Sequence, residues 1–98
     1  MPAYIIALVD VTDWDQYRQY TKATPAVIDH FGGKFVVRGG KMAALEGPEE
    51  TRRVVVLEFP TFERAQEFFH SEEYSRVRKL REGAANGQFF VVDGYPGA

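Results

Sequence analysis

The feature that most constrains the fold of this sequence is an internal repeat. Residues 9–15 (VDVTDWD) align with residues 57–63 (LEFPTFE). Each segment ends an apolar run with an acidic residue and continues with a helix-start residue, an aromatic residue and a second acid. This pattern predicts a strand followed by a helix. The chain is therefore expected to contain two strand-helix halves, with Asp10 and Glu58 in equivalent places at the carboxyl ends of two strands.

Four runs of β-branched and aromatic residues alternate with segments of helical periodicity or turn-forming residues. The runs lie near residues 3–11, 34–46, 53–59 and 88–93. Gly47-Pro48-Glu49-Glu50 is expected to form the turn of the middle hairpin. The element order is therefore βαββαβ, and a chain of 98 residues with this order predicts one domain that spans residues 1–98. Such a domain is an α+β sandwich of two helices on a four-stranded sheet.

The first helix is expected to have Thr12 as its N-cap and to stop at Gly32-Gly33. The step Thr24-Pro25 either kinks this helix or restarts it, because proline lacks the N–H that a helix interior needs. The spacing of its residues predicts one buried face, formed by Trp14, Tyr17, Thr21, Thr24, Ile28 and Phe31.

The second helix is expected to begin after Thr61, a residue type that caps helices. The helical spacing of its apolar residues slips by one position at His70-Ser71. We therefore expect the helix to break there, with Ser71 as the N-cap of a further helical piece.

Two right-handed crossovers are expected to place the first and third strands side by side and parallel at the centre of the sheet. Asp10 and Glu58 would then be neighbours. Adjacent strands lie about 4.8 Å apart, so two carboxylates on one face would interact strongly unless a cation or a shared proton intervened. Arg38, on the strand expected beside the third, is the candidate cation.

The sheet is expected to be apolar on both faces. Residues 5–8, 54–57 and 89–92 are apolar at both strand parities, yet two helices cover one face only. A monomer would leave a large apolar surface in water. We therefore predict a homodimer in which two sheets pack face to face.

Composition excludes several classes of function. A formal net charge of -2 and a pI of about 5.6 argue against nucleic-acid binding, and the third strand lacks the exposed aromatics of an RNA-recognition motif. The chain has no cysteine, which excludes thiol catalysis and thiolate metal sites. No apolar run approaches the roughly 20 residues of a membrane span, and the amino-terminal residues lack a secretory signal. We expect a cytoplasmic protein with no metal site.

The chain resembles the family called domain of unknown function 1330 (DUF1330), in the dimeric α/β-barrel branch of ferredoxin-like folds. The resemblance rests on DVTD at 10–13, Tyr17, Tyr20, GGKFVVRGG at 32–40, Glu46-Gly47, VVVLEFP at 54–60, Ser71, Tyr74 and Arg81. It implies a ferredoxin-like βαββαβ homodimer but no agreed activity. The wider superfamily includes cofactor-independent monooxygenases and haem-using members. No haem-binding histidine signature maps onto this chain, so no cofactor is expected.

Two carboxylates and several polar side chains are the candidate site residues. Glu58 and Asp10 are the candidate catalytic groups, although strand-end capping explains them equally well. The candidate substrate-binding residues are Arg38, Tyr17, Ser71, Tyr74, Arg81 and His70. Each also has a structural interpretation: a β-bulge, a helix cap or core packing. The hydroxyls of Tyr17, Tyr20, Thr21 and Thr24 either line a pocket or belong to residues that only pack.

Three functions fit this pattern. The first is an enzyme that acts on a small anionic or aromatic metabolite without a cofactor, by acid-base chemistry of Glu58 or Asp10. The second is a non-catalytic module that binds a small molecule. The third is a structural homodimer that binds a protein partner. The sequence leaves open whether the chain is an enzyme.

Overall fold

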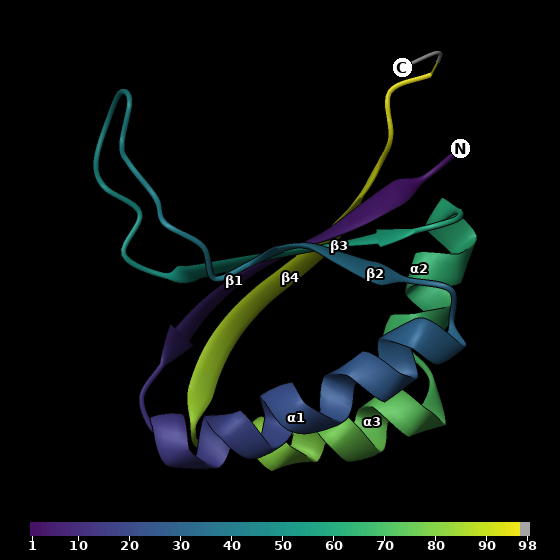
Figure 1. Ribbon diagram of the computed structural model, residues 1–98, viewed down its shortest axis with the longest axis horizontal. Coiled ribbons are helices and arrows are strands. Elements are labelled where there is room, and N and C mark those ends of the chain that lie inside the picture. The colour runs from purple at the N-terminus through teal and green to yellow at the C-terminus, as the bar shows by residue number, and fades with distance from the viewer. Residues whose placement is uncertain (97–98) are drawn as a thin grey trace.

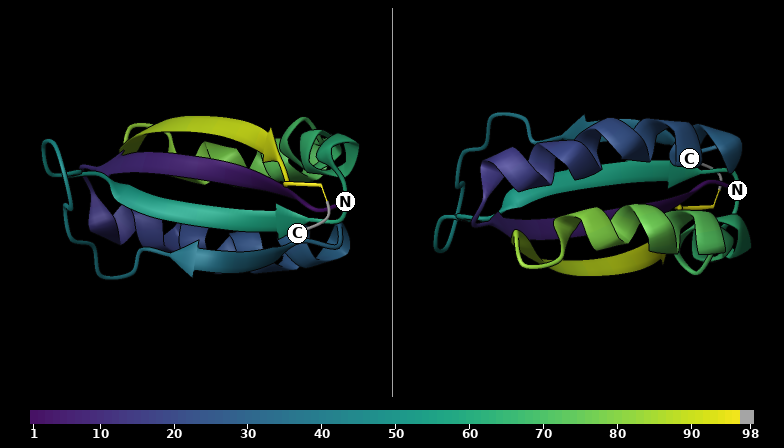
Figure 2. Two further views of the ribbon diagram at one scale, coloured as in Figure 1. Left: turned by 90° about the horizontal axis from the view of Figure 1, so that it is seen from above. Right: turned by 90° about the horizontal axis from the view of Figure 1, so that it is seen from below.

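The computed structural model describes residues 1–96 and contains one four-stranded sheet with its helices gathered on one face (Figure 1). Seen from above and below, the strands lie in one layer and α1 runs beside α3 in the other (Figure 2). The elements in chain order are β1 (Ala3–Val11), α1 (Trp14–His30), β2 (Lys34–Arg38), β3 (Arg53–Phe59), α2 (Phe62–Phe69), α3 (Glu72–Arg78), the 3-10 helix η1 (Lys79–Arg81) and β4 (Ala85–Asp93). The predicted α+β sandwich is confirmed as a ferredoxin-like βαββαβ fold.

The strand order is β2-β3-β1-β4, and every neighbouring pair is antiparallel. The prediction of parallel first and third strands is therefore wrong. In this fold each crossover helix joins two parallel strands that are separated by one strand, so β1 is parallel to β2. The strand between them, β3, follows β2 through a hairpin and must run the opposite way.

This direction separates the two repeated acids. Tyr4 is paired with Glu58 near one end of β1, whereas Val9 is paired with Arg53 near the other end. Asp10 lies one residue beyond Val9, so it and Glu58 occupy opposite ends of the sheet. The predicted carboxylate pair does not form.

The middle hairpin differs from the prediction in length. β2 ends at Arg38, and a long loop of residues 39–52, here called the arm, joins it to β3. Gly47 does adopt a left-handed conformation at φ 81°, but it lies within the arm and not in a tight turn between strands. A bulge between Phe35 and Val37 shifts the register of β2.

The start of α1 shows a second difference. Asp13 is the N-cap, with a side-chain oxygen that accepts a hydrogen bond from the Gln16 N–H at 3.1 Å. Thr12 instead donates its hydroxyl to the Ala84 carbonyl at 3.0 Å and ties the helix start to the chain before β4. Threonine and aspartate are both favourable N-cap residues, so the sequence alone did not show which of the two caps α1.

The helix α1 continues through Pro25 to His30. Its buried side includes the expected Tyr17, Thr24 and Ile28. Trp14 was expected on the buried face but is 46% exposed, whereas Tyr20, which was not expected on that face, is buried.

The expected break of the second helix is confirmed. Thr61 accepts a hydrogen bond from the Arg64 N–H and caps α2. Ser71 accepts one from the Tyr74 N–H at 3.1 Å and caps α3. The break turns the chain so that α3 packs beside α1 and brings Tyr74 into the core.

The core lies between the helices and one face of the sheet. On β1 the odd-numbered residues from Ala3 to Val9 are buried, whereas Tyr4, Ile6 and Leu8 point to the uncovered face and are half-buried. The arm and the chain after β4 both project beyond that uncovered face (Figure 1). The fold therefore has a filled side and an open, apolar side.

Candidate functional site

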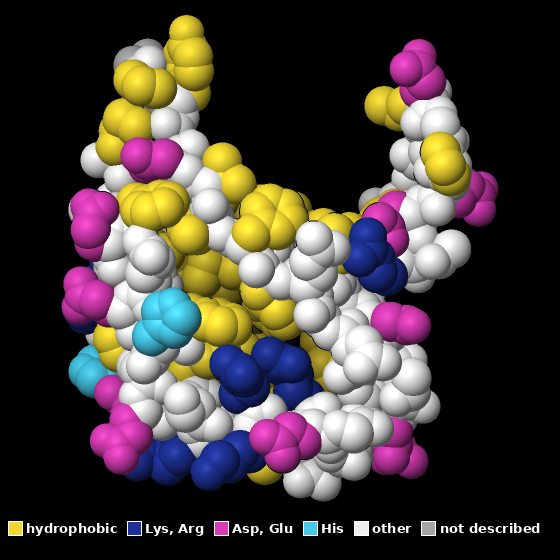
Figure 3. Space-filling model, turned by 180° about the vertical axis from the view of Figure 1, so that it is seen from behind, with side chains coloured by type: hydrophobic (Ala, Val, Ile, Leu, Met, Phe, Trp, Pro, Cys, Tyr) yellow, Lys and Arg dark blue, Asp and Glu magenta, His cyan; other side chains and the backbone are white. Residues whose placement is uncertain are grey.

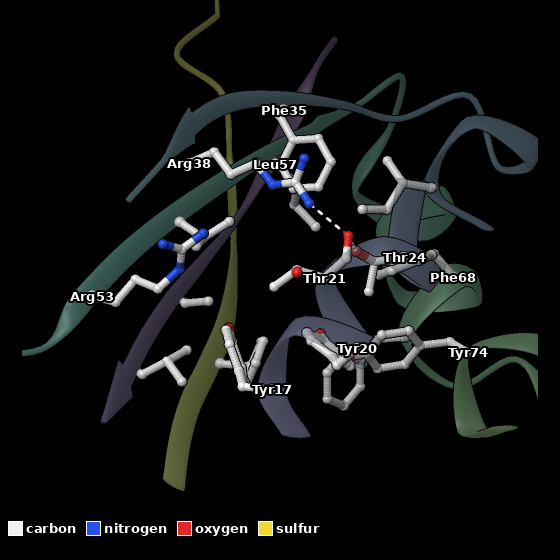
Figure 4. A pocket seen from close by; sticks show the side chains of 16 residues that line it. Tyr17, Tyr20, Thr21, Thr24, Phe35, Arg38, Arg53, Leu57, Phe68 and Tyr74 are labelled. Carbon is white, nitrogen blue, oxygen red and sulfur yellow. Dashed lines mark hydrogen bonds between the residues drawn. The ribbon is translucent and has the colours of Figure 1, made fainter. Parts of the chain in front are cut away.

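A cavity lies between the helix-covered face of the sheet and α1, α2 and α3 (Figure 4). About 500 Å³ of space lies between its lining residues, and this figure includes open solvent. The lining residues are Ala7, Val9, Tyr17, Tyr20, Thr21, Thr24, Ile28, Phe35, Arg38, Arg53, Val55, Leu57, Phe68, Phe69, Tyr74 and Phe89. These residues include two guanidinium groups but no carboxylate. The cavity is thus apolar, with several hydroxyls and an excess of positive charge.

Arg38 reaches the cavity because Pro25 leaves a helix carbonyl without its normal partner. In a regular helix the N–H of residue 25 would bond to the carbonyl of Thr21. Pro25 has no N–H, and Nη2 of Arg38 donates to the Thr21 carbonyl oxygen at 2.7 Å instead (Figure 4). The guanidinium also stacks 4.2 Å from the centre of the Phe35 ring. Arg38 is exposed, so its remaining donors are available at the cavity edge.

Arg53 is the first residue of β3, on the same face as Val55 and Leu57. Its Nε atom is buried and has no hydrogen-bond partner among the described residues. The centre of its guanidinium lies 5.7 Å from the Trp14 ring and 6.0 Å from the Tyr17 ring. A buried donor of this kind is costly unless an acceptor reaches it.

The guanidinium of Arg53 lies where a side chain at residue 39 would be. A Cβ atom at Gly39 would collide with the Nη1 atom of Arg53. Gly39 also has a φ of 66°, in the left-handed region that disfavours other residues. The arm therefore starts with a residue that both permits the turn and leaves room for the guanidinium.

A pair of buried tyrosines closes the helix side of the cavity. The hydroxyl oxygens of Tyr20 and Tyr74 are 2.6 Å apart, and Tyr74 is only 1% exposed. Nη2 of Arg81 donates to the Tyr74 hydroxyl at 3.4 Å, and its guanidinium lies 5.3 Å from the Tyr20 ring. The Nε atom of Arg81 is buried without a hydrogen-bond partner in the part of the chain that the structure describes. Arg81 thus adds positive charge behind the tyrosine pair.

Tyr17 and Tyr20 act as neutral hydrogen-bonding groups at physiological pH. Burial raises the pKa of Tyr20, and the charge and hydrogen bond of Tyr74 raise it further. Burial also raises the pKa of Tyr17, although the nearby guanidinium groups of Arg53 and Arg81 oppose the shift. A ligand oxygen in the cavity would therefore meet phenol groups that can donate hydrogen bonds.

The two candidate catalytic acids lie outside this cavity. Glu58 forms an ion pair with Lys34 at 3.4 Å, and its place between the buried Leu57 and Phe59 turns its side chain to the uncovered face. Asp10 lines a separate groove at the far end of the sheet. The expectation that Arg38 would lie between these acids is wrong, because Arg38 is on the helix-covered face.

Ser71 and His70 also lie apart from the cavity. Ser71 caps α3 and donates its hydroxyl to the Phe68 carbonyl at 2.7 Å. His70 lines a groove beside Phe69 and β4. A view from behind shows hydrophobic side chains gathered in a hollow under the sheet on this side (Figure 3). These two residues have local structural roles.

The structure brings together Tyr17, Arg38, Tyr74 and, just behind them, Arg81. Arg53 is a further site residue that was not among the candidates expected from the sequence. Arg53 and Arg38 share a recognisable signal, because each arginine directly adjoins an apolar run, residues 54–57 for Arg53 and residues 35–37 for Arg38. The described residues contain no cluster of three or more potential metal ligands and no helix long and apolar enough to cross a membrane.

Comparison with known proteins identifies the family. The model of the family called domain of unknown function (DUF1330) matches residues 2–95. The chain belongs to this family. One curated relative, "Putative disease resistance RPP13-like protein 3" from Arabidopsis thaliana, is 32% identical over 79 residues. This match covers 81% of the chain but 9% of the relative, so the chain spans less than a tenth of that protein.

Solved structures with the same fold differ in what is known of them. A protein of unknown function from Rhodopseudomonas palustris has a TM-score of 0.75 and 22% identity, with 96% of this chain and 82% of that chain covered. SnoaB, a cofactor-independent oxygenase from Streptomyces nogalater, has a TM-score of 0.68 and 8% identity, with 96% and 93% covered. A dimeric ferredoxin-like protein of unknown function from Bacteroides fragilis has a TM-score of 0.63 and 12% identity, with 95% and 96% covered. At these identities the similarity establishes only the fold of this DUF1330 member. Its chemistry has to be inferred from its own side chains.

Proposed function

We propose that this protein binds a small anionic metabolite with an aromatic or apolar body in the cavity between the sheet and the helices. The observation that supports this most strongly is the charge of the cavity: two guanidinium groups in an apolar lining without a carboxylate. An arginine in an apolar environment normally has an anionic partner. A ligand carboxylate would supply that partner for Arg53.

The hydroxyls in the cavity favour the same class of ligand. The phenol of Tyr17 and the Tyr20–Tyr74 pair lie where a carboxylate or phenolate oxygen could accept hydrogen bonds. The aromatic rings of Phe35, Phe68 and other lining residues would contact an apolar body. A flat ring that carries one carboxylate satisfies both parts of the lining.

The geometry favours binding over carboxylate acid-base catalysis. Glu58 and Asp10, the expected proton-transfer groups, do not line the cavity. Burial raises the pKa of both Tyr17 and Tyr20, so these phenols keep their protons at neutral pH. They could orient a ligand through hydrogen bonds, but they could not accept a proton from it. SnoaB is described as a cofactor-independent oxygenase, and its fold is similar over 96% of this chain. That activity is therefore the second candidate.

Calorimetric titration with a matched pair of probes tests the binding proposal. The probes are 3-phenylpropanoate and its neutral amide, titrated into the parent protein and into Arg38→Met and Arg53→Met. Arg18→Met is the control, because Arg18 is exposed and pairs with Asp15 away from the cavity. We expect the acid to bind and each cavity variant to weaken it roughly ten- to a hundredfold, since a hydrogen bond to a charged group contributes about 1.5–3 kcal/mol.

Several results would contradict the proposal. One is equal affinity for the acid and the amide, because the guanidinium groups would then play no part. Another is an equal loss in Arg18→Met, which would indicate a nonspecific effect of charge. Absence of binding for a wider panel of benzoates, phenylacetates and phenols would refute the binding proposal. Consumption of oxygen by the parent protein with any bound probe would favour the oxygenase candidate.

We further propose that the protein is a homodimer joined through the uncovered face of the sheet. Its exposed apolar residues include Phe90 and Val92, which are 44% and 46% exposed. Two proteins of similar fold, from Bacteroides fragilis and Jannaschia, are described as dimeric. A face of this kind is stabilised when a second copy covers it. A cytoplasmic location remains a prediction from the sequence.

A further inference from the structure

We infer that Tyr20 receives a second oxygen of the ligand, a carbonyl or similar acceptor at the end of the molecule away from the carboxylate. This inference rests on the proposed function, because it adds a specificity-determining residue to the same cavity. Tyr20 and Tyr74 both line that cavity. They are 8% and 1% exposed, so their hydroxyls need hydrogen-bond partners inside the protein or on a ligand.

The cluster around these two tyrosines has one more hydrogen-bond donor than it has acceptors for. Each phenol carries one proton, and a guanidinium can only donate. The hydroxyl oxygens of Tyr20 and Tyr74 lie 2.6 Å apart, so one phenol proton lies between them. Nη2 of Arg81 donates to the oxygen of Tyr74 and accepts nothing in return. The second phenol proton therefore has no acceptor among residues 1–96.

The position of Arg81 indicates which phenol holds the second proton. Its guanidinium donates to the Tyr74 hydroxyl at 3.4 Å. A hydroxyl whose oxygen accepts a hydrogen bond from a cation becomes a stronger donor, because consecutive hydrogen bonds polarise one another. Tyr74 therefore donates to Tyr20, and the proton of Tyr20 is left for a ligand in the cavity. Arg81 and Tyr74 position this proton, and Tyr20 presents it.

Tyr20 and Arg53 line the same cavity, so a single ligand could contact both. Tyr17 lies beside each of them, because its ring is 6.0 Å from the guanidinium of Arg53 and 5.4 Å from the ring of Tyr20. Arg53 lies at one side of the cavity, and Tyr20 and Tyr74 lie at the other (Figure 4). A benzene ring beside Tyr17, with its carboxylate at Arg53, would direct its para position toward Tyr20. The ligand class is therefore an aromatic acid with an acceptor oxygen at the far end of its ring.

Calorimetry with two ligands of the same shape tests this assignment. The probes are the para-acetyl and para-isopropenyl derivatives of 3-phenylpropanoate, which differ only in a carbonyl oxygen that replaces a CH2 group. The affinity of the acetyl compound relative to the isopropenyl compound should fall about two- to tenfold in Tyr20→Phe, the contribution of a neutral hydrogen bond. Tyr74→Phe should keep most of the parent ratio, because Tyr20 retains its own proton. Tyr95→Phe, a change at an exposed residue outside the cavity, is the control and should keep all of it.

The outcomes separate this inference from the proposed function. If 3-phenylpropanoate binds in an Arg53-dependent way but Tyr20→Phe keeps the parent ratio, the assignment of Tyr20 is wrong and the proposed function stands. A ratio that falls as far in Tyr74→Phe as in Tyr20→Phe, or falls in Tyr74→Phe alone, would also overturn the assignment. If no probe binds, or binding ignores Arg53→Met, the proposed function fails and takes the inference with it. Both ligands are measured on the same variant, so a partial loss of fold weakens both equally and leaves their ratio unchanged.

Discussion

At the scale of single residues, the polar side chains of the site depend on the size and hydrogen-bonding groups of their neighbours. Gly39 has no Cβ and so leaves space for the guanidinium of Arg53. The hydroxyls of Tyr20 and Tyr74 hydrogen-bond to each other in the core, where a hydroxyl without a partner would be destabilising. Each arrangement has a substitution that tests it directly.

We predict that Gly39→Ala displaces Arg53 and weakens binding of 3-phenylpropanoate. The added Cβ would collide with Nη1 of Arg53, and a non-glycine residue at a φ of 66° is strained by about 1–2 kcal/mol. Thermal unfolding and calorimetry should both show a loss. Gly40→Ala is the matched control, because a Cβ there meets no atom within 4 Å. Equal effects of the two substitutions would show that Arg53 is not held by the space at residue 39.

We predict that the buried tyrosines make the protein sensitive to alkali. Burial raises the pKa of Tyr20 in the folded protein above the usual 10.0. Its contribution to stability is therefore complete below about pH 10 and is lost as the pH rises, because the unfolded chain ionises first. The loss is about 1.4 kcal/mol per pH unit for one such group.

Denaturation with urea from pH 8 to pH 11.5, followed by circular dichroism, checks this dependence. The free energy of unfolding should fall above pH 10 in the parent protein and fall less steeply in Tyr20→Phe. Tyr95→Phe, a change at a residue that is 81% exposed, should leave the slope of the parent. An identical slope in Tyr20→Phe would mean that Tyr20 ionises normally in the folded state.

At the scale of elements, a proline inside α1 links this helix to β2. Pro25 removes one helical hydrogen bond, and Arg38 donates to the freed carbonyl of Thr21 across the cavity edge. The helix therefore gives up local stability, and β2 gains an anchor for a cationic side chain. The capped break at Ser71 has a comparable role, because it directs α3 toward α1 and places Tyr74 against Tyr20.

We predict that Pro25→Ala stabilises the protein and weakens the anchor of Arg38. Alanine restores the N–H to Thr21, and proline in a helix interior costs about 3 kcal/mol, offset by about 1 kcal/mol of unfolded-chain entropy. The melting temperature should rise by several degrees, while the affinity for 3-phenylpropanoate should fall because Arg38 is held less firmly. Pro48→Ala in the arm is the control and should change neither quantity. A fall in melting temperature would show that the bond from Arg38 fully compensates for the proline.

At the scale of the whole molecule, the sheet has one face that helices cover and one that they leave open. The arm and the chain after β4 rise on either side of the open face, so that it forms the floor of a trough (Figure 1, Figure 3). Leu45 in the arm is 97% exposed. An exposed leucine on a long loop beside an apolar sheet favours contact with a second copy.

We predict that Phe90→Glu converts a dimer into a monomer. Phe90 is 44% exposed on the open face, so the charge is tolerated in a monomer but would be buried between two sheets. Light scattering after size exclusion should give about twice 11.1 kDa for the parent and 11.1 kDa for the variant. Lys22→Glu on the outer side of α1 is the control and should stay dimeric. A monomeric parent at micromolar concentration would refute the dimer.

The sequence by itself determined the local structure of this protein. The caps at Thr61 and Ser71, the break between α2 and α3 and the βαββαβ order follow from short-range signals, namely hydrogen bonds to the first helix turn and the spacing of apolar residues. Local patterns also singled out four site residues. Arg38 follows an apolar run, and Tyr17, Tyr74 and Arg81 lie at the helical spacing of the expected buried faces.

Only the tertiary structure decided which of these residues meet. The repeat made Asp10 and Glu58 look equivalent, but the antiparallel pairing of β1 and β3 sends them to opposite ends of the sheet. The pairing also brings Arg53 to the cavity and places it under Gly39. Strand direction and side-chain proximity arise from contacts between segments far apart in the chain, and a local pattern carries no information about them.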